Sequence, residues 1–129
     1  MNIKSRKDLA IEASKQIGKI LKTGFGTILK IKGKKDKSLV SNIDLKAERT
    51  IIQLVKQYYP MDGILSEESK EQTSKSGYKW IIDPLDGTHN YIHKIDIFGT
   101  SIALTFEEKV IFGNYLHPLS KRIVYCSKR

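Results

Sequence analysis

Two aspartates, Asp83 and Asp86, follow directly on the apolar run Trp80-Ile81-Ile82. A run of this kind predicts a buried strand, and Pro84 keeps Asp83 extended while it begins a turn. The two carboxylates can therefore converge at the tip of the strand instead of alternating between its faces. Because converging carboxylates repel each other, this spacing favours a site for a divalent cation.

The two residues that follow the aspartates suit a phosphate ligand. Gly87 lets the backbone approach a ligand closely. Thr88 offers a hydroxyl beside backbone N–H groups if a helix begins there. Metal and phosphate chemistry is therefore the first hypothesis for this stretch.

Asp44 lies at the expected start of a helix and has two interpretations. Ser41 and Asp44 are spaced like a capping box, in which side chains satisfy the free backbone N–H groups of a helix start. Alternatively, the carboxylate is held beside a site at that helix start. Position alone favours the helix cap.

A pair of adjacent acids, Glu67 and Glu68, follows the apolar residues Ile64-Leu65. Adjacent side chains of an extended segment point in opposite directions. At most one of the pair is therefore expected to bind a metal, while its neighbour faces solvent or caps another group. A solvated surface loop is the alternative, and the polar tract 70–77 favours it.

The composition is that of a soluble globular chain with the length of one domain. The 129 residues are 40% hydrophobic and 29% charged, which suffices for a hydrophobic core. No run reaches a transmembrane length and the N-terminus lacks the apolar core of a signal peptide, so we expect a cytoplasmic protein. The single Cys126 excludes an internal disulfide and a cysteine metal cage. The histidines are interpreted as surface or core residues: His89, His93 and His117.

The formal charge of +9 raises nucleic acid as a partner. Of the 23 basic residues, however, 19 are lysine and four are arginine, whereas reading of base edges depends mainly on arginine. A lysine-rich nucleic-acid-binding module is therefore an unfavoured alternative. Attraction of a small anionic substrate explains the charge better.

Periodic apolar positions predict two helices and a sheet. One helix extends from Ser5 to Gly24, and another begins near Asp44 and stops at Pro60. The remaining elements are an extended basic segment, short strands, a hairpin and a last strand: 27–37 with a turn near Gly33, 64–65, 80–82, 101–115 and 122–126. The predicted fold class is α/β, with layered helices and sheet in a single domain, residues 1–129.

The run from Trp80 to His93 resembles the signature of the inositol monophosphatase family of magnesium-dependent, lithium-sensitive phosphatases. The segments 65–69 (LSEES) and 39–44 (LVSNID) resemble two further motifs of that family in order and spacing. The resemblance covers nearly the whole chain. It implies a layered sugar-phosphatase fold and Mg²⁺-dependent hydrolysis of a small phosphate monoester such as an inositol phosphate or a fructose bisphosphate.

Carried over to this sequence, the resemblance assigns each candidate residue a role. Glu68, Asp83 and Asp86 would bind Mg²⁺ with their side chains, and Leu85 would bind it with its carbonyl. Gly87 and Thr88 would contact the substrate phosphate. The catalytic set would be Asp44, Glu68 and Thr88, with Thr88 and Asp44 positioning the attacking water.

The chain also departs from the family pattern, because family members are about twice as long. Their Trp-Asp-x-Ala-Ala-Gly motif, whose aspartate completes a metal site, has no counterpart here. The chain therefore corresponds to the N-terminal, metal-binding half of the fold, apparently truncated after that half. The alternative to an enzyme is a truncated, non-catalytic remnant that keeps part of the metal site. Association into a homo-oligomer or with a complementing C-terminal half is expected, because an unfinished sheet exposes edges and apolar surface.

Overall fold

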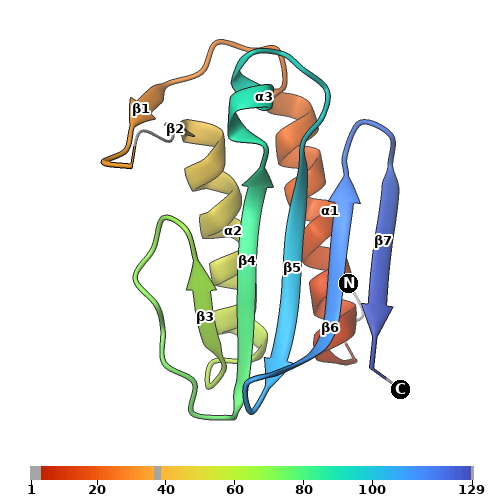
Figure 1. Ribbon diagram of the computed structural model, residues 1–129. Coiled ribbons are helices and arrows are strands. Elements are labelled where there is room, and N and C mark those ends of the chain that lie inside the picture. Colours follow the sequence, from red (N-terminus) through yellow and green to blue (C-terminus); the bar gives the residue numbers. More distant parts are fainter. Residues whose placement is uncertain (1–3, 37–38, 129) are drawn as a thin grey trace.

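The computed structural model describes residues 4–36 and 39–128 of the chain. Its centre is a five-stranded sheet in the order β3-β4-β5-β6-β7, and two long helices lie behind this sheet in Figure 1. The strands are β3 (Gly63–Ser66), β4 (Tyr78–Asp86), β5 (Gly99–Phe106), β6 (Lys109–His117) and β7 (Arg122–Ser127). The predicted α/β layering is thereby confirmed.

Both long helices begin at the side-chain caps that the sequence predicts. α1 (Arg6–Gly24) follows Ser5, whose hydroxyl accepts a hydrogen bond from the backbone N–H of Asp8. α2 (Asn42–Tyr58) begins with a capping box formed by Ser41 and Asp44. It ends shortly before Pro60, because a proline disfavours helical geometry at the residue before it.

The apolar faces of α1 and α2 pack against one face of the sheet. The helices contribute Leu9, Ala13, Ile17, Leu21, Ala47, Ile51 and Val55, and the sheet contributes Trp80, Ile82, Ile102, Leu104 and Phe112. All of these side chains are buried. Burial of this continuous apolar layer is the main force that holds the helices on the sheet.

Strand β3 pairs with β4 in parallel, whereas the other strands of the sheet are antiparallel. Ser66, the last residue of β3, is the partner of Ile82 in β4. The residues that follow β3 therefore emerge beside the aspartates at the end of β4, because parallel strands end at the same edge of a sheet. This pairing brings two distant acidic segments together.

A small two-stranded hairpin and a short helix surround that edge. The hairpin pairs β1 (Ile31–Gly33) with β2 (Leu39–Ser41), which agrees with the extended segment predicted around Gly33. Part of the intervening turn lies outside the described residues. The segment after Gly87 forms α3 (Thr88–Ile92), so a helix does begin at Thr88, the condition that the phosphate hypothesis set for this residue.

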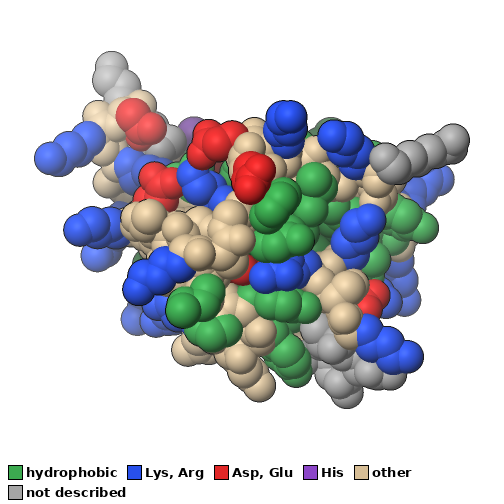
Figure 2. Space-filling view, turned by 90° about the horizontal axis from the view of Figure 1, so that it is seen from below, with side chains coloured by type: hydrophobic (Ala, Val, Ile, Leu, Met, Phe, Trp, Pro, Cys, Tyr) green, Lys and Arg blue, Asp and Glu red, His purple; other side chains and the backbone are tan. Residues whose placement is uncertain are grey.

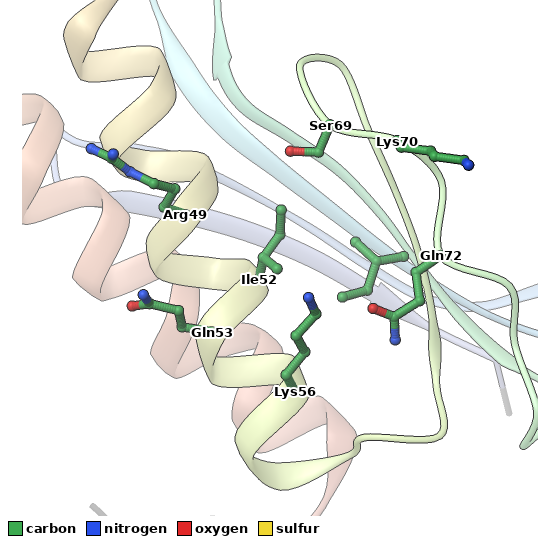
Figure 3. Close-up of a pocket in the computed structure, with 8 residues that line it drawn as sticks. Arg49, Ile52, Gln53, Lys56, Ser69, Lys70 and Gln72 are labelled. Carbon is green, nitrogen blue, oxygen red and sulfur yellow. The ribbon is translucent and has the colours of Figure 1, made fainter.

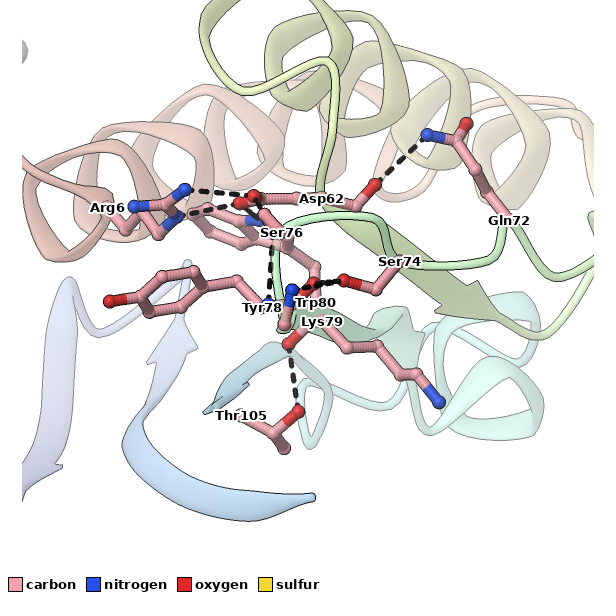
Figure 4. A network of polar contacts seen from close by, with 10 residues as sticks. Arg6, Asp62, Gln72, Ser74, Ser76, Tyr78, Lys79, Trp80 and Thr105 are labelled. Carbon is pink, nitrogen blue, oxygen red and sulfur yellow. Dashed lines mark hydrogen bonds and ion pairs between the residues drawn. The ribbon is translucent and has the colours of Figure 1, made fainter. Parts of the chain in front are cut away.

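Asp62, the residue before β3, joins α1 to β4 through its buried carboxylate. Asp62 is fully buried, and its carboxylate accepts hydrogen bonds from Arg6 Nε and Nη2 at 2.8 and 2.9 Å (Figure 4). Ser76 Oγ and Trp80 Nε1 donate to the same carboxylate at 2.6 and 2.9 Å. Burial alone raises the pKa of Asp62, but these hydrogen bonds and the charge of Arg6 outweigh burial and lower the pKa below its ordinary value.

The second face of the sheet is not covered by α1 or α2. Across all five strands the register aligns a row of residues on this face: Leu65, Ile81, Ala103, Gly113 and Cys126. Leu65 and Ile81 are each 38% exposed, and Val124 of β7 is 71% exposed. We call this surface the uncovered face.

Charged side chains are scattered over the end of the molecule seen in Figure 2. Lys and Arg side chains lie around the whole outline of this view, interleaved with acidic and apolar side chains, and do not gather into one stripe. Among the described residues that this view shows, therefore, no continuous basic track suits a nucleic-acid backbone. Within the described residues, no helix is long and apolar enough to cross a membrane.

Candidate metal centre

The end of β4 delivers Asp83 and Asp86 to one pocket of about 270 Å³. Asp83 pairs with Ser101 of β5 and Asp86 pairs with Gly99, so three steps along β4 match two along β5. This register shift breaks the alternation of side chains between the two faces. Both carboxylates therefore line one pocket, although β4 continues through Pro84 to Asp86 and does not turn at Pro84 as predicted.

Asp83 has the least favourable surroundings for a negative charge among the carboxylates of the pocket. Its Oδ1 atom is buried, and no hydrogen-bond donor among the described residues reaches it. Burial, and then the negative charges of Glu67, Asp86 and Asp44, raises the pKa of Asp83 to about 7. A buried carboxylate oxygen without a donor is costly. A cation bound at this position would relieve that cost, so the donor set fits a divalent metal.

Asp86 is held by a residue that the sequence analysis does not single out. Tyr115 of β6 donates a hydrogen bond from its hydroxyl to Asp86 Oδ2 at 3.1 Å. Burial and the charge of Asp86 raise the pKa of Tyr115 to about 12. Alternation along β6 predicts only that Tyr115 lies on the face opposite Asn114. The contact with Asp86 depends on how β5 and β6 pair.

Asp44 serves the helix cap and the pocket together. Its Oδ2 atom accepts the backbone N–H of Ser41 at 2.9 Å, which confirms the capping interpretation. Its Oδ1 atom accepts a hydrogen bond from Thr88 Oγ1 at 3.0 Å. The carbonyl oxygen of Leu85 lies 3.2 Å from the same hydroxyl. The start of α2 is therefore joined directly to the start of α3.

The two adjacent glutamates have different surroundings. Glu68 is 13% exposed at its side chain and forms an ion pair with Lys34 at 2.8 Å. Glu67 is 52% exposed, lies at 4.0 Å from the same lysine nitrogen and lines the pocket with Asp83 and Asp86. The structure thus brings Glu67, rather than Glu68, to the other acids. The parallel register of β3 and β4 ends at Ser66 and Ile82, which directly precede Glu67 and Asp83, so a prediction of that pairing would have found Glu67.

Gly87 closes the turn between β4 and α3 in a left-handed conformation with φ of +85°. A Cβ atom there would lie 3.0 Å from the carbonyl oxygen of Ile97, so a side chain would add contact strain to backbone strain. Gly87 and Thr88 both line the pocket. Within the described residues, no three acidic, histidine or cysteine side chains already form a metal cage. The carboxylates line an open pocket and do not meet at one point.

A second pocket, of about 250 Å³, lies between α2 and the loop after β3. It is lined by Arg49, Lys56 and Lys70, among others, but in Figure 3 the side chains of Arg49 and Lys70 point away from each other. Their charges do not converge on one ligand position. The pocket at the end of β4 is therefore the better candidate site.

The fold and this pocket define an α/β protein with an acidic site at the end of β4, the strand that joins the parallel and antiparallel parts of its sheet. The profile of the inositol monophosphatase family matches residues 3–129. The chain belongs to the inositol monophosphatase family. The family predicted from the motifs around Asp83 is confirmed.

Relatives and a solved structure agree with this assignment. The chain is 34% identical over 129 residues to a fructose-1,6-bisphosphatase/inositol-1-monophosphatase of Aquifex aeolicus. The aligned region covers 98% of this chain and 49% of that protein. It is 38% identical over 106 residues to a histidinol-phosphatase of Chlorobaculum parvum, covering 81% of this chain and 41% of that protein. The crystal structure of the extragenic suppressor protein suhB from Bartonella henselae matches with a TM-score of 0.91 at 31% identity, covering 95% and 48% of the two chains. The chain spans about half the length of the curated relatives it matches.

Proposed function

We propose that the chain takes part in Mg²⁺-dependent hydrolysis of a small phosphate monoester at the pocket at the end of β4. The observation that carries this proposal is Asp83, whose buried oxygen lacks a hydrogen-bond donor and whose pKa is raised by neighbouring acids. Such a carboxylate needs a positive partner. A bound cation would supply it and would leave Gly87 and Thr88 to contact the phosphate.

The proposed metal ligands are the carboxylates of Asp83 and Asp86 and the carbonyl oxygen of Leu85. The family resemblance assigns the remaining ligand to Glu68, but the ion pair of Glu68 with Lys34 favours Glu67. Glu67 lines the pocket and its charge acts on Asp83. Bound Mg²⁺ would neutralise charge on the phosphate and lower the pKa of a water molecule.

Thr88 and Asp44 are proposed to orient the attacking water. The Thr88 hydroxyl donates its proton toward Asp44 Oδ1, so its oxygen lone pairs remain free to accept a hydrogen bond from water. The water oxygen would then form the new bond to phosphorus while the alcohol leaves with a proton. This route needs no covalent intermediate on the protein.

The substrate is proposed to be a small phosphorylated alcohol. The relatives named above are a fructose-1,6-bisphosphatase/inositol-1-monophosphatase and a histidinol-phosphatase, and these names share a phosphate monoester on a small polar molecule. The net charge of +9 favours an anion of that class. Lithium sensitivity is expected with the same site.

The uncovered face favours a second partner in this function. Asp83, Ser101, Tyr115 and Val124 align on the uncovered face, so the pocket opens on the surface that lacks helices. A second polypeptide on this face would bury apolar surface and close the site. We propose a complementing half, or a second copy, in that role, and a non-catalytic remnant is the alternative for the isolated chain.

Phosphate release tests the proposed activity. The chain is assayed with inositol-1-phosphate, fructose-1,6-bisphosphate and histidinol phosphate, with Mg²⁺ and with added Li⁺. We expect Mg²⁺-dependent release that Li⁺ reduces and that Asp83→Asn abolishes. A folded, monodisperse sample without any release would leave the remnant interpretation for the isolated chain.

A further inference from the structure

Glu48 is a buried acid in α2 that the proposed chemistry does not use. Its side chain is 2% exposed. It accepts hydrogen bonds from Ser66 Oγ, from the backbone N–H of Glu68 at 2.9 Å and from Ser69 Oγ at 2.6 Å. All three donors belong to the segment 66–69, which begins with the last residue of β3 and continues into the turn after it. Both carboxylate oxygens are therefore used by one segment of four residues.

A buried carboxylate is expensive unless it is paired or fully hydrogen-bonded. Among the ion pairs of the described residues, none involves Glu48. Its charge is compensated only by the donors of the turn 66–69. Contacts this specific fix the backbone of the turn more strongly than packing alone would.

The turn held by Glu48 carries both adjacent glutamates. The parallel pairing of Ser66 with Ile82 fixes where the turn begins, and the bond from Glu68 N–H to Glu48 fixes its path one residue after Glu67. Lys34 then holds the side chain of Glu68. Glu67 is left as the acid that lines the pocket with Asp83.

Asp44 and Glu48 lie four residues apart on α2, and hence on the same side of the helix. Asp44 holds Thr88, and Glu48 holds the turn beside Glu67. One helix face therefore sets the distance between the phosphate-binding and acidic sides of the pocket. Because both contacts come from one rigid helix, a shift at either carboxylate changes the geometry of the site.

We propose that Glu48 is a positioning residue that directs Glu67, and not Glu68, into the metal pocket. The proposal rests on the proposed function, since it concerns the same metal site. Glu48 acts through the turn and does not itself touch the metal or the substrate. Loss of a residue that orients a metal ligand typically lowers metal affinity by about ten-fold to a hundred-fold.

The test compares Glu48→Ala, Glu48→Gln and Asp62→Asn in the full 129-residue chain. Asp62 is the matched control, because it is also a buried carboxylate that accepts several hydrogen bonds, but its donors Arg6, Ser76 and Trp80 do not line the pocket. Two quantities are measured at a temperature where every variant is folded. They are the hydrogen-exchange protection of the amides of residues 66–69 without metal, and the affinity for Mg²⁺ alone by calorimetry.

We expect Glu48→Ala to lose protection at the Glu68 amide and to bind Mg²⁺ about ten-fold more weakly or worse. Glu48→Gln should recover much of both quantities, since its amide oxygen still accepts. Asp62→Asn should lower the melting temperature without changing either quantity. Unchanged exchange at residues 66–69 in Glu48→Ala would overturn the proposal, as would unchanged Mg²⁺ affinity. Absence of Mg²⁺ binding by the unmodified chain would instead overturn the proposed function. In that case hydrogen exchange at residues 66–69 alone would test whether Glu48 holds the turn.

Discussion

At the scale of single residues, the pocket combines groups that disfavour one another in the absence of a cation. Asp83 has an oxygen without a donor and is surrounded by the charges of Glu67, Asp86 and Asp44. Hydrogen bonds relieve only part of the repulsion between these carboxylates. Thr88 donates to Asp44 and Tyr115 donates to Asp86, but neither donates to Asp83. Sites of this kind sacrifice stability for ligand binding.

The first prediction concerns Asp83→Asn. The substitution removes one negative charge from the cluster, so the metal-free protein should gain about 1 kcal/mol in free energy of unfolding. Stabilisation by added Mg²⁺ should disappear. Both effects are measured by urea unfolding with EDTA and with excess Mg²⁺. An equal Mg²⁺-dependent gain in the variant and the unmodified chain would rule out Asp83 as a ligand.

The second prediction separates the two adjacent glutamates. Glu67→Gln should weaken Mg²⁺ binding by about ten-fold or more, because it removes a charge that lines the pocket. Glu68→Gln should change Mg²⁺ affinity little and cost about 1 kcal/mol of stability, since it removes only the ion pair with Lys34. Calorimetric titration of both variants with Mg²⁺ checks this. The reverse order of effects would restore Glu68 as the ligand.

At the scale of elements, local patterns predict what depends on neighbours in the chain. Ser5 and Ser41 mark the starts of α1 and α2 because a cap acts within one helical turn. The strand that leads into Asp83 follows from the apolar run before it, whereas the turn predicted at Pro84 is wrong because β4 pairs with β5 as far as Asp86. The caps and this strand need only short-range steric and hydrogen-bonding rules, so the sequence alone reveals them.

Other parts of the site depend on contacts between distant segments. Glu67 is distinguished from Glu68 only by the parallel pairing of β3 with β4 and by Lys34 from the β1–β2 turn. Tyr115 reaches Asp86 only because of how β5 and β6 pair. Glu48 is buried in α2, although a pattern of apolar residues alone would place a glutamate on the solvent-exposed side of the helix. No local rule contains this information.

The third prediction concerns Asp62, whose carboxylate joins α1 to β4. The pKa of Asp62 is lowered in the folded state, so its charge stabilises the fold above the ordinary value of 3.8 and this contribution is lost as the pH falls through and below that value. Asp62→Asn should therefore cost about 3 kcal/mol near neutral pH, where it leaves Arg6 without its anion. The difference from the unmodified chain should shrink in acid. Urea unfolding at neutral and acidic pH measures both.

A matched control for Asp62 is Glu71→Gln, which removes the more exposed ion pair with Lys79. Its effect on the free energy of unfolding should be small at either pH, because an exposed ion pair is screened by solvent. A constant difference between Asp62→Asn and the unmodified chain across the pH range would show that the charge of Asp62 is not what anchors β4.

At the scale of the whole molecule, the sheet has one buried and one uncovered face. Sheets normally bury both faces when apolar side chains line them, and the row from Leu65 to Cys126 is mostly apolar or small. A second hollow on this same face shares Glu67 and Asp83 with the pocket at the end of β4. The chain also spans about half the length of its relatives. We therefore expect one additional polypeptide segment both to cover this face of the sheet and to complete the site.

The last prediction tests this cover with the second half of the Aquifex aeolicus relative, the part beyond the matched region. Mixed with the chain, it should form a one-to-one complex in sedimentation velocity and raise Mg²⁺-dependent phosphate release. Ile81→Lys should prevent the complex, because it places a charge at the centre of the uncovered face without disturbing the buried one. Ile28→Lys is the control, since Ile28 is fully exposed and lies outside the sheet.

Equal complex formation by both variants would show that the uncovered face is not the docking surface. The same conclusion would follow from full activity of a monomeric chain without the second half, because the site would then need no cover.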